Sequence, residues 1–196
     1  MTHPLPRHKA LCFDAFGTLV ESGDNRHGWH RLVSHLPTQT AEHIIYRALT
    51  EPLPLDDLRQ ITGADEHRWH RFLDDLHAET STIQWRKGLE HHVQSLIDRA
   101  IPVALCSNLA QPYVTGLQAI IDDHIPRRLQ ILSCDLSCRK PEPEIYAHVS
   151  TALGLPPSDI LFIGDTPRAD VDGPREAGFN ALLIDDYMTA VQAKQI

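Results

Sequence analysis

Short apolar runs in this sequence are followed by polar residues whose types could do chemistry together. The first run ends at Asp14, the second at Ser107-Asn108 and the fourth at Gly164-Asp165, while Lys140 comes shortly after the third. A single acid, serine or asparagine in such a place is ordinarily a turn or helix-capping residue. Because four such positions follow four successive runs, we expect them to form one site.

Two carboxylates and a lysine are the groups that phosphoryl transfer through an aspartate requires. Asp14 and Asp165 are suited to hold Mg²⁺, a hard cation that prefers oxygen ligands. Lys140 would offset the charge of an anionic substrate, so that Asp14 could attack phosphorus as a carboxylate nucleophile. Water would then hydrolyse the aspartyl-phosphate.

Further residues beside these could bind the transferred group. Thr18 and Ser107 offer hydroxyl donors, and Gly17 permits close approach of the backbone. Asn108 has two open interpretations, because its side chain could donate to the substrate or cap the following helix. The expected substrate-binding residues are Gly17, Thr18, Ser107, Asn108 and Lys140.

The elements that must position these residues follow from the spacing of apolar residues. The apolar runs have the length of strands, and helical patterns separate the later runs, which predicts a parallel sheet covered on both faces. The carboxyl ends of such strands meet in one crevice. The predicted strands are 10–13, 101–106, 129–132, 160–163 and 181–184, and the predicted helices between them are 89–99, 112–121, 142–153 and 169–177.

The stretch from about residue 21 to residue 85 differs from the rest of the chain. It shows no convincing strand and has helical periodicity over 30–36, 41–49, 55–61 and 66–80, with prolines and a glycine between these pieces. We therefore expect a helical insert directly after the first strand. Its tryptophans, together with Trp85 at its end, are expected to build a small core, and Trp29 could lie over the site.

The polar residues and their order resemble the four motifs of the haloacid dehalogenase superfamily. The motifs are Asp14-Ala15-Phe16-Gly17-Thr18-Leu19, Ser107-Asn108, Lys140-Pro141, and Gly164-Asp165-Thr166-Pro167-Arg168-Ala169-Asp170. The resemblance implies an α/β fold with a Rossmann-like, doubly wound parallel sheet and a small helical cap of the family's first type inserted after the first strand. The core would comprise residues 1–20 and 86–196, and the cap would comprise residues 21–85.

The resemblance also implies roles for individual residues. Asp14 would be the catalytic nucleophile and Lys140 its catalytic partner. Mg²⁺ would be held by Asp14, by Asp165 and by the backbone carbonyl of Phe16. Asp170 would orient Lys140 or metal-bound water, although an acid near the start of the next helix needs no such role.

Phe16 departs from the phosphatase pattern of this superfamily. Most of its phosphatases have a second Asp there as general acid and base, and phenylalanine can do neither. The 2-haloacid dehalogenases also lack that acid, because halide leaves without a proton, but they tend to have Ser-Asn where this chain has Gly164-Asp165. We therefore expect a Mg²⁺-dependent phosphohydrolase of a small phosphorylated metabolite. A 2-haloacid dehalogenase and a non-catalytic phosphate-binding protein are the alternatives.

Composition limits the partners. The 196 residues include 18 basic and 26 acidic ones, a formal net charge of −8, and 42% are hydrophobic, which excludes disordered and fibrous classes. This charge predicts no binding to nucleic acid but allows a small anionic substrate. No run of 18 apolar residues predicts a membrane span, and the start of the chain is unlike a signal peptide. We expect a cytoplasmic monomer or homodimer whose four cysteines are free thiols.

Overall fold

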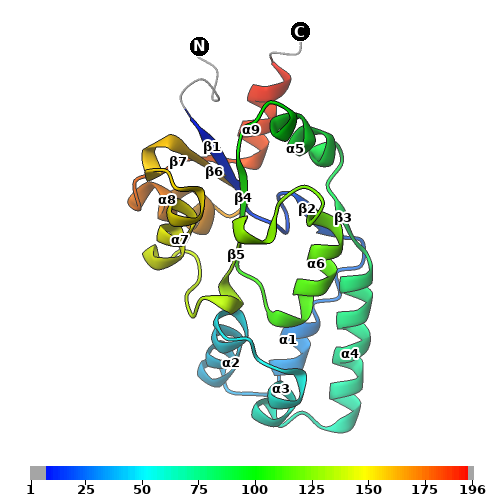
Figure 1. The fold of residues 1–196 in the computed structure, drawn as a ribbon. Coiled ribbons are helices and arrows are strands. Elements are labelled where there is room, and N and C mark those ends of the chain that lie inside the picture. Colours follow the sequence, from blue (N-terminus) through cyan, green and yellow to red (C-terminus); the bar gives the residue numbers. More distant parts are fainter. Residues whose placement is uncertain (1–7, 194–196) are drawn as a thin grey trace.

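Five strands form one parallel sheet in the computed structural model, which describes residues 8–193 (Figure 1). The strands are β1 (Ala10–Phe13), β4 (Val103–Ser107), β5 (Gln130–Leu132), β6 (Ile160–Gly164) and β7 (Asn180–Leu183). Their spatial order is β5-β4-β1-β6-β7, so the chain builds outward from β1 first on one side and then on the other. The predicted α/β fold with a doubly wound parallel sheet is confirmed.

Helices cover both faces of this sheet, which explains why its strands are continuous apolar runs. Phe13 of β1 contacts Tyr187 edge to face, with ring centroids 5.7 Å apart, on one side of the sheet. Phe162 lies opposite Cys12, the neighbour of Phe13, so its side chain faces the other side of the sheet. There its ring contacts that of Tyr146, with ring centroids 5.7 Å apart. The helices of this part are α5 (Leu89–Asp98), α6 (Val114–Ile121), α7 (Pro143–Leu153), α8 (Gly173–Glu176) and α9 (Ile184–Gln192).

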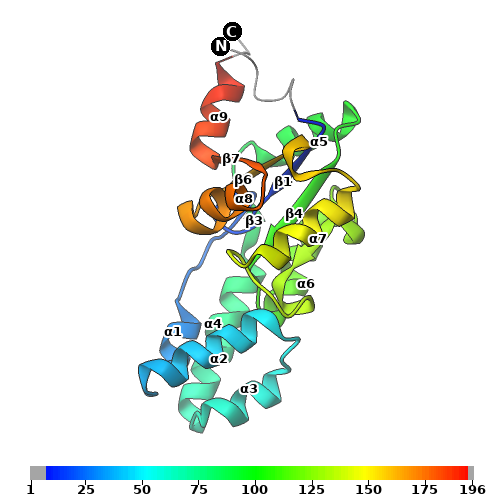
Figure 2. The same ribbon diagram turned by 90° about the vertical axis from the view of Figure 1, so that its left-hand side faces the viewer.

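Four further helices lie together at one end of the molecule, beyond the carboxyl ends of the strands (Figure 2). They are α1 (Gly28–Val33), α2 (Thr38–Thr50), α3 (Leu55–Thr62) and α4 (Glu66–Ser81). They enclose a hydrophobic cluster separate from that of the sheet. In this cluster the ring centroid of Phe72 lies 5.3 Å from that of Trp29 and 5.4 Å from that of Trp69. All four helices agree with the predicted ones, because each buries an apolar stripe at helical spacing.

The expectation of no strand between residues 21 and 85 is wrong at both ends of that stretch. β2 (Val20–Ser22) and β3 (Ile83–Trp85) pair antiparallel, with Val20 opposite Trp85. Strands of three residues are too short to show an alternating pattern, and their pairing joins segments about sixty residues apart. The two chain segments that lead into and out of the four helices are therefore hydrogen-bonded to each other.

Two predicted helices also differ in detail from the structure. The predicted helix 112–121 begins with a 3₁₀ turn, Gln111–Tyr113, before α6. The predicted helix 169–177 is a π-helical segment, Pro167–Asp172, followed by the short α8. A π-helical turn inside a helix frequently marks a functional site, and this one contains Asp170.

Replacing Phe72 should make the protein easier to unfold. Phe72 is 2% exposed at the centre of the cluster of the four helices, so Phe72→Ala should lower the free energy of unfolding by about 3–5 kcal/mol. His70→Ala, on the exposed side of the same helix, should change it by less than about 0.5 kcal/mol. Urea denaturation followed by circular dichroism measures both, and equal effects would contradict a core at this place.

Candidate active site

Asp14 lies at the end of β1, where the order in which the chain adds strands to the sheet reverses. It follows β1, the central strand, and its backbone N–H donates to the carbonyl of Ile163 at 2.8 Å. Ser107 ends the neighbouring strand β4, and Gly164 ends the neighbouring strand β6, directly before Asp165. The three strand ends that the sequence singled out are therefore adjacent in space.

Lys140 is buried between two carboxylates. Its Nζ donates to Asp14 Oδ1 at 2.7 Å and to Asp170 Oδ1 at 2.6 Å, and the residue is only 4% exposed. Burial by itself lowers the pKa of a lysine, but the attraction of Asp14 and Asp170 outweighs it, so the pKa of Lys140 is raised above its ordinary value. Lys140 is therefore a permanent cation at this site.

The Asp14 carboxyl has a pKa raised above its usual range. Burial is the main cause, and the nearby Asp170 carboxylate adds to it, while Lys140 and the backbone N–H of Ala15 act in the opposite direction. A further cation beside Asp14 would favour its charged, nucleophilic form.

Backbone contacts fix the position of Lys140. Asn108 donates from Nδ2 to the Lys140 carbonyl at 2.8 Å, and its Oδ1 accepts from the Lys140 N–H at 2.8 Å. Asn108 does not cap the following helical segment, whose capping position is Ala110. Its predicted contact with substrate stays a prediction, since the structure shows its amide engaged with Lys140.

Asp170 is held by the turn in which it lies. Its Oδ2 accepts from the backbone N–H of Thr166 at 2.9 Å, and its Oδ1 accepts from Lys140. The carboxyl group lies against Gly164, where an added Cβ would come within 2.3 Å of the Asp170 Cγ. Glycine at position 164 is therefore required for Asp170 to reach Lys140.

The acidic side chains are placed so that they could share a metal ion. Carboxylate oxygens of Asp14, Asp165 and Asp170 lie within 4.8 Å of one another. Asp165 is exposed and lies against Gly17, which has φ +80° and no room for a Cβ. This all-oxygen donor set fits a hard cation such as Mg²⁺.

Two of the predicted substrate-binding hydroxyls are buried. Ser107 is 2% exposed, and Thr18 is fully buried. The Thr18 hydroxyl has no hydrogen-bond partner among residues 8–193. Their contacts with a substrate stay predictions, as does that of the Gly17 backbone.

Arg86 is a residue that sequence reasoning missed. Its guanidinium donates to the Gly17 carbonyl, and its backbone N–H donates to the Leu19 carbonyl at 2.8 Å. Arg86 follows β3 and so holds the loop after Asp14 in place. Nothing in the sequence distinguishes this arginine from the others, because the contact joins residues 69 positions apart.

Glu79 connects α4 to the part of the chain next to Asp14. This buried carboxylate accepts from the backbone N–H groups of Arg26 at 3.0 Å and of Gly28 at 3.3 Å, and from the Tyr113 hydroxyl. Tyr113 in turn contacts the Phe16 ring edge to face at 6.1 Å. The Tyr113 pKa is raised by burial and by this carboxylate, so Tyr113 stays neutral.

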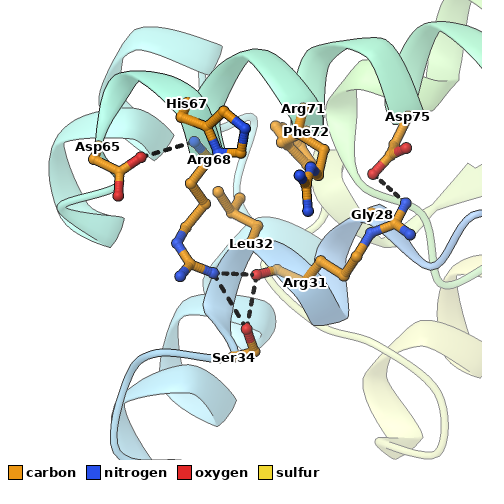
Figure 3. Close-up of a pocket in the computed structure, with 10 residues that line it drawn as sticks. All are labelled: Gly28, Arg31, Leu32, Ser34, Asp65, His67, Arg68, Arg71, Phe72 and Asp75. Carbon is orange, nitrogen blue, oxygen red and sulfur yellow. Dashed lines mark hydrogen bonds and ion pairs between the residues drawn. The ribbon is translucent and has the colours of Figure 1, made fainter.

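Two cavities lie near or within the four helices. One, of about 230 Å³, is lined by Phe16, Asn108 and Tyr113 together with residues of α1 and α2. The other, of about 290 Å³, lies between α1 and α4 (Figure 3). There Arg31 pairs with Asp75, and Arg68 donates to the Arg31 carbonyl at 2.8 Å, so these charges connect the two helices.

Three arginines between residues 21 and 85 have carboxylate partners in the chain itself. Arg26 pairs with Asp24, Arg31 with Asp75 and Arg47 with Glu51. None of these three arginines lines the cavity beside Phe16. A 2-haloacid carries a carboxylate that needs a cation, and these pairings leave the three arginines less available for it.

Residues 8–178 match the sequence model of the haloacid dehalogenase-like hydrolase family. The chain belongs to this family. No helix among the described residues is long and apolar enough to cross a membrane.

Solved structures with the same fold cover most of the chain. A haloacid dehalogenase family enzyme from Bacteroides thetaiotaomicron, in complex with magnesium and inorganic phosphate, has a TM-score of 0.64 at 20% identity, covering 90% of this chain and 93% of that one. A predicted phosphoglycolate phosphatase from Haemophilus somnus has a TM-score of 0.58 at 20% identity, covering 90% of this chain and 84% of that one.

Curated relatives match over short segments. A phosphoserine phosphatase from Thermus thermophilus is 33% identical over 57 residues, which are 29% of this chain and 23% of that protein. An Enolase-phosphatase E1 from Methylococcus capsulatus is 42% identical over 45 residues, which are 23% of this chain and 19% of that protein. Each matched segment thus spans less than a quarter of the relative's length.

Removing the lysine should leave two buried carboxylates without a cation. We expect Lys140→Met to lower the free energy of unfolding at pH 8 by roughly 3–5 kcal/mol. The cost should be smaller at pH 5, because the Asp14 pKa, already raised, rises further without Lys140, and protonation then removes the repulsion. Urea denaturation at the two pH values measures this.

A second substitution separates charge from packing. Adding Asp170→Asn to Lys140→Met should restore part of the lost stability, because only one carboxylate then remains. A double variant no more stable than Lys140→Met, with no dependence on pH, would mean that the lysine acts by packing alone.

Proposed function

We propose that the protein is a Mg²⁺-dependent phosphohydrolase that acts on a small phosphorylated compound through an aspartyl-phosphate at Asp14. The observation that carries this proposal is the buried contact of Lys140 with both Asp14 and Asp170 beside the exposed Asp165. The magnesium and phosphate in the Bacteroides structure, and the phosphatase names of the relatives, support it.

In this proposal Asp14 is the nucleophile. One of its oxygens attacks phosphorus, the bond from phosphorus to the leaving oxygen breaks, and the electron pair goes to the leaving group. Water then attacks the aspartyl-phosphate and releases inorganic phosphate, which restores the carboxylate. Lys140 offsets the negative charge that develops on the phosphoryl oxygens.

Other residues hold the reacting groups in place. Asp14, Asp165 and the Phe16 carbonyl would hold Mg²⁺, which neutralises charge on the phosphoryl group when bound. Asp170 orients Lys140 and is not itself in contact with substrate. Residues 21–85 would act as a cap that excludes water from the reaction, and their separate hydrophobic cluster supports this division.

A dehalogenase is the second candidate, and Phe16 is the observation that favours it. Against it stand the three-carboxylate cluster and the pairing of Arg26, Arg31 and Arg47 with acids of the chain. Without a cation the neighbouring carboxylates would raise each other's pKa and weaken Asp14 as a nucleophile. These observations favour the phosphatase.

Hydrolysis of p-nitrophenyl phosphate tests the proposed activity. We expect turnover with Mg²⁺, loss with EDTA and a fall of roughly 10⁴-fold or more in Asp14→Asn. Asp172→Asn is the matched control, because Asp172 is an exposed acid just beyond Asp170. Chloride release from 2-chloropropionate that is indifferent to EDTA would instead identify a dehalogenase, and no turnover of either substrate would leave a binding protein.

Phe16→Asp tests whether a missing general acid limits the rate. A carboxyl group at this half-buried position should raise kcat/KM for alkyl phosphates, whose leaving groups need a proton, by about 10²- to 10⁴-fold. The effect on p-nitrophenyl phosphate should be much smaller. Phe16→Asn, which cannot transfer a proton, should show no such gain, and an equal gain in both variants would contradict this explanation.

A further inference from the structure

The cavity beside Phe16 has walls from both parts of the molecule. Phe16 and Tyr113 come from the part that contains the sheet, and Trp29 and Leu49 come from α1 and α2. Ala48 and Leu109 contribute further apolar surface. A molecule in this cavity would contact mainly aromatic and aliphatic side chains.

The cavity is next to the proposed reaction centre. Phe16 is two residues beyond Asp14, and Asn108, which also lines the cavity, holds both backbone groups of Lys140. Asp14 and Lys140 do not line the cavity themselves, but through Phe16 and Asn108 it adjoins them, so it is a candidate site for the leaving group of a phosphoryl group held there.

The lining offers little to a charged or polyhydroxylated leaving group. Among residues 8–193, Tyr113 is the one ionisable residue that lines it, and its hydroxyl already donates to Glu79. The Asn108 amide is engaged with Lys140. Burying a charge or several hydroxyl groups against this lining without hydrogen-bond partners is unfavourable in free energy. The lining therefore disfavours sugar phosphates and phosphorylated amino or organic acids.

The replacement of an acid by Phe16 leads to the same conclusion from the chemistry. Without a general acid at this place, a leaving group has to depart as an anion, which aromatic alcohols do far more readily than alkyl alcohols. The volume of about 230 Å³ exceeds the roughly 150 Å³ that accepts benzene in an engineered cavity. One substituted ring is therefore of suitable size.

We propose that the substrates are phosphate monoesters of uncharged aromatic alcohols, with the ring held in the cavity between Phe16, Tyr113, Trp29 and Leu49. This inference rests on the proposed phosphohydrolase activity for its chemistry, but the ring site makes a separate claim about binding. Phe16 thereby has a positive role, as a wall of the ring site in place of a proton donor.

Binding of phosphonates, which cannot be hydrolysed, tests the ring site without relying on turnover. In the presence of Mg²⁺, phenylphosphonate should bind the intact protein about 10- to 100-fold more tightly than methylphosphonate, because only the former buries a ring. 4-Carboxyphenylphosphonate should lose most of that gain. Calorimetric titration measures all three, and equal affinities would overturn the proposal.

Leu49→Lys provides a change of specificity that simple unfolding cannot imitate. A cation in the cavity wall should weaken phenylphosphonate by about 10-fold and strengthen the carboxylated analogue over the original protein. Leu49→Met should leave the order of affinities unchanged. Leu73→Lys, on α4 and not among the residues that line the cavity, controls for general destabilisation. A Leu49→Lys protein that keeps the original order would also contradict the ring site.

Kinetics then separates the two proposals. We expect kcat/KM for phenyl phosphate to exceed that for glucose 6-phosphate by at least about 100-fold. Preferred binding of phenylphosphonate without turnover of any ester would overturn the phosphohydrolase and leave the ring site standing. Turnover with equal kcat/KM for both esters would overturn the ring site and leave the phosphohydrolase standing.

Discussion

The contact of Lys140 with Asp14 and Asp170 is the interaction on which the rest of the site depends. Three charged groups are removed from water together, and each would be costly to bury alone. The structure provides for them with specific backbone contacts: Asn108 holds the Lys140 backbone, the Thr166 N–H holds Asp170, and Gly164 leaves space for the Asp170 carboxyl. The parallel sheet brings these pieces together, since β4, β1 and β6 are neighbours.

The loop after Asp14 contacts the acidic side chains on one side and an apolar cavity on the other. On one side Gly17 adopts a positive φ and makes room for Asp165. On the other side Phe16 contributes its ring to an apolar cavity and contacts Tyr113. Arg86 holds the loop between these sides through the carbonyls of Gly17 and Leu19. An ionic centre and an apolar wall are thus joined within three residues of chain.

Polar contacts help to fix the four helices relative to the sheet. Glu79 receives the backbone where it enters α1 and also the hydroxyl of Tyr113, so one buried carboxylate connects the two hydrophobic clusters. Tyr113 packs against both clusters. The short pairing of β2 with β3 joins the entering and leaving segments. These contacts hold the helices beside Phe16, and they join residues that are distant in the sequence.

The sequence by itself predicted the parallel α/β fold, the four helices after the first strand, and that Asp14, Lys140, Asp165 and Asp170 would lie close together. This was possible because buried strands and amphipathic helices leave periodic patterns, and because residues at the ends of parallel strands converge. The tertiary structure alone decided the pairing of β2 with β3, the engagement of Asn108 with Lys140, the contact of Arg86 with the loop after Asp14, and the cavity beside Phe16. These features join residues far apart in the chain, where no local pattern exists to record them.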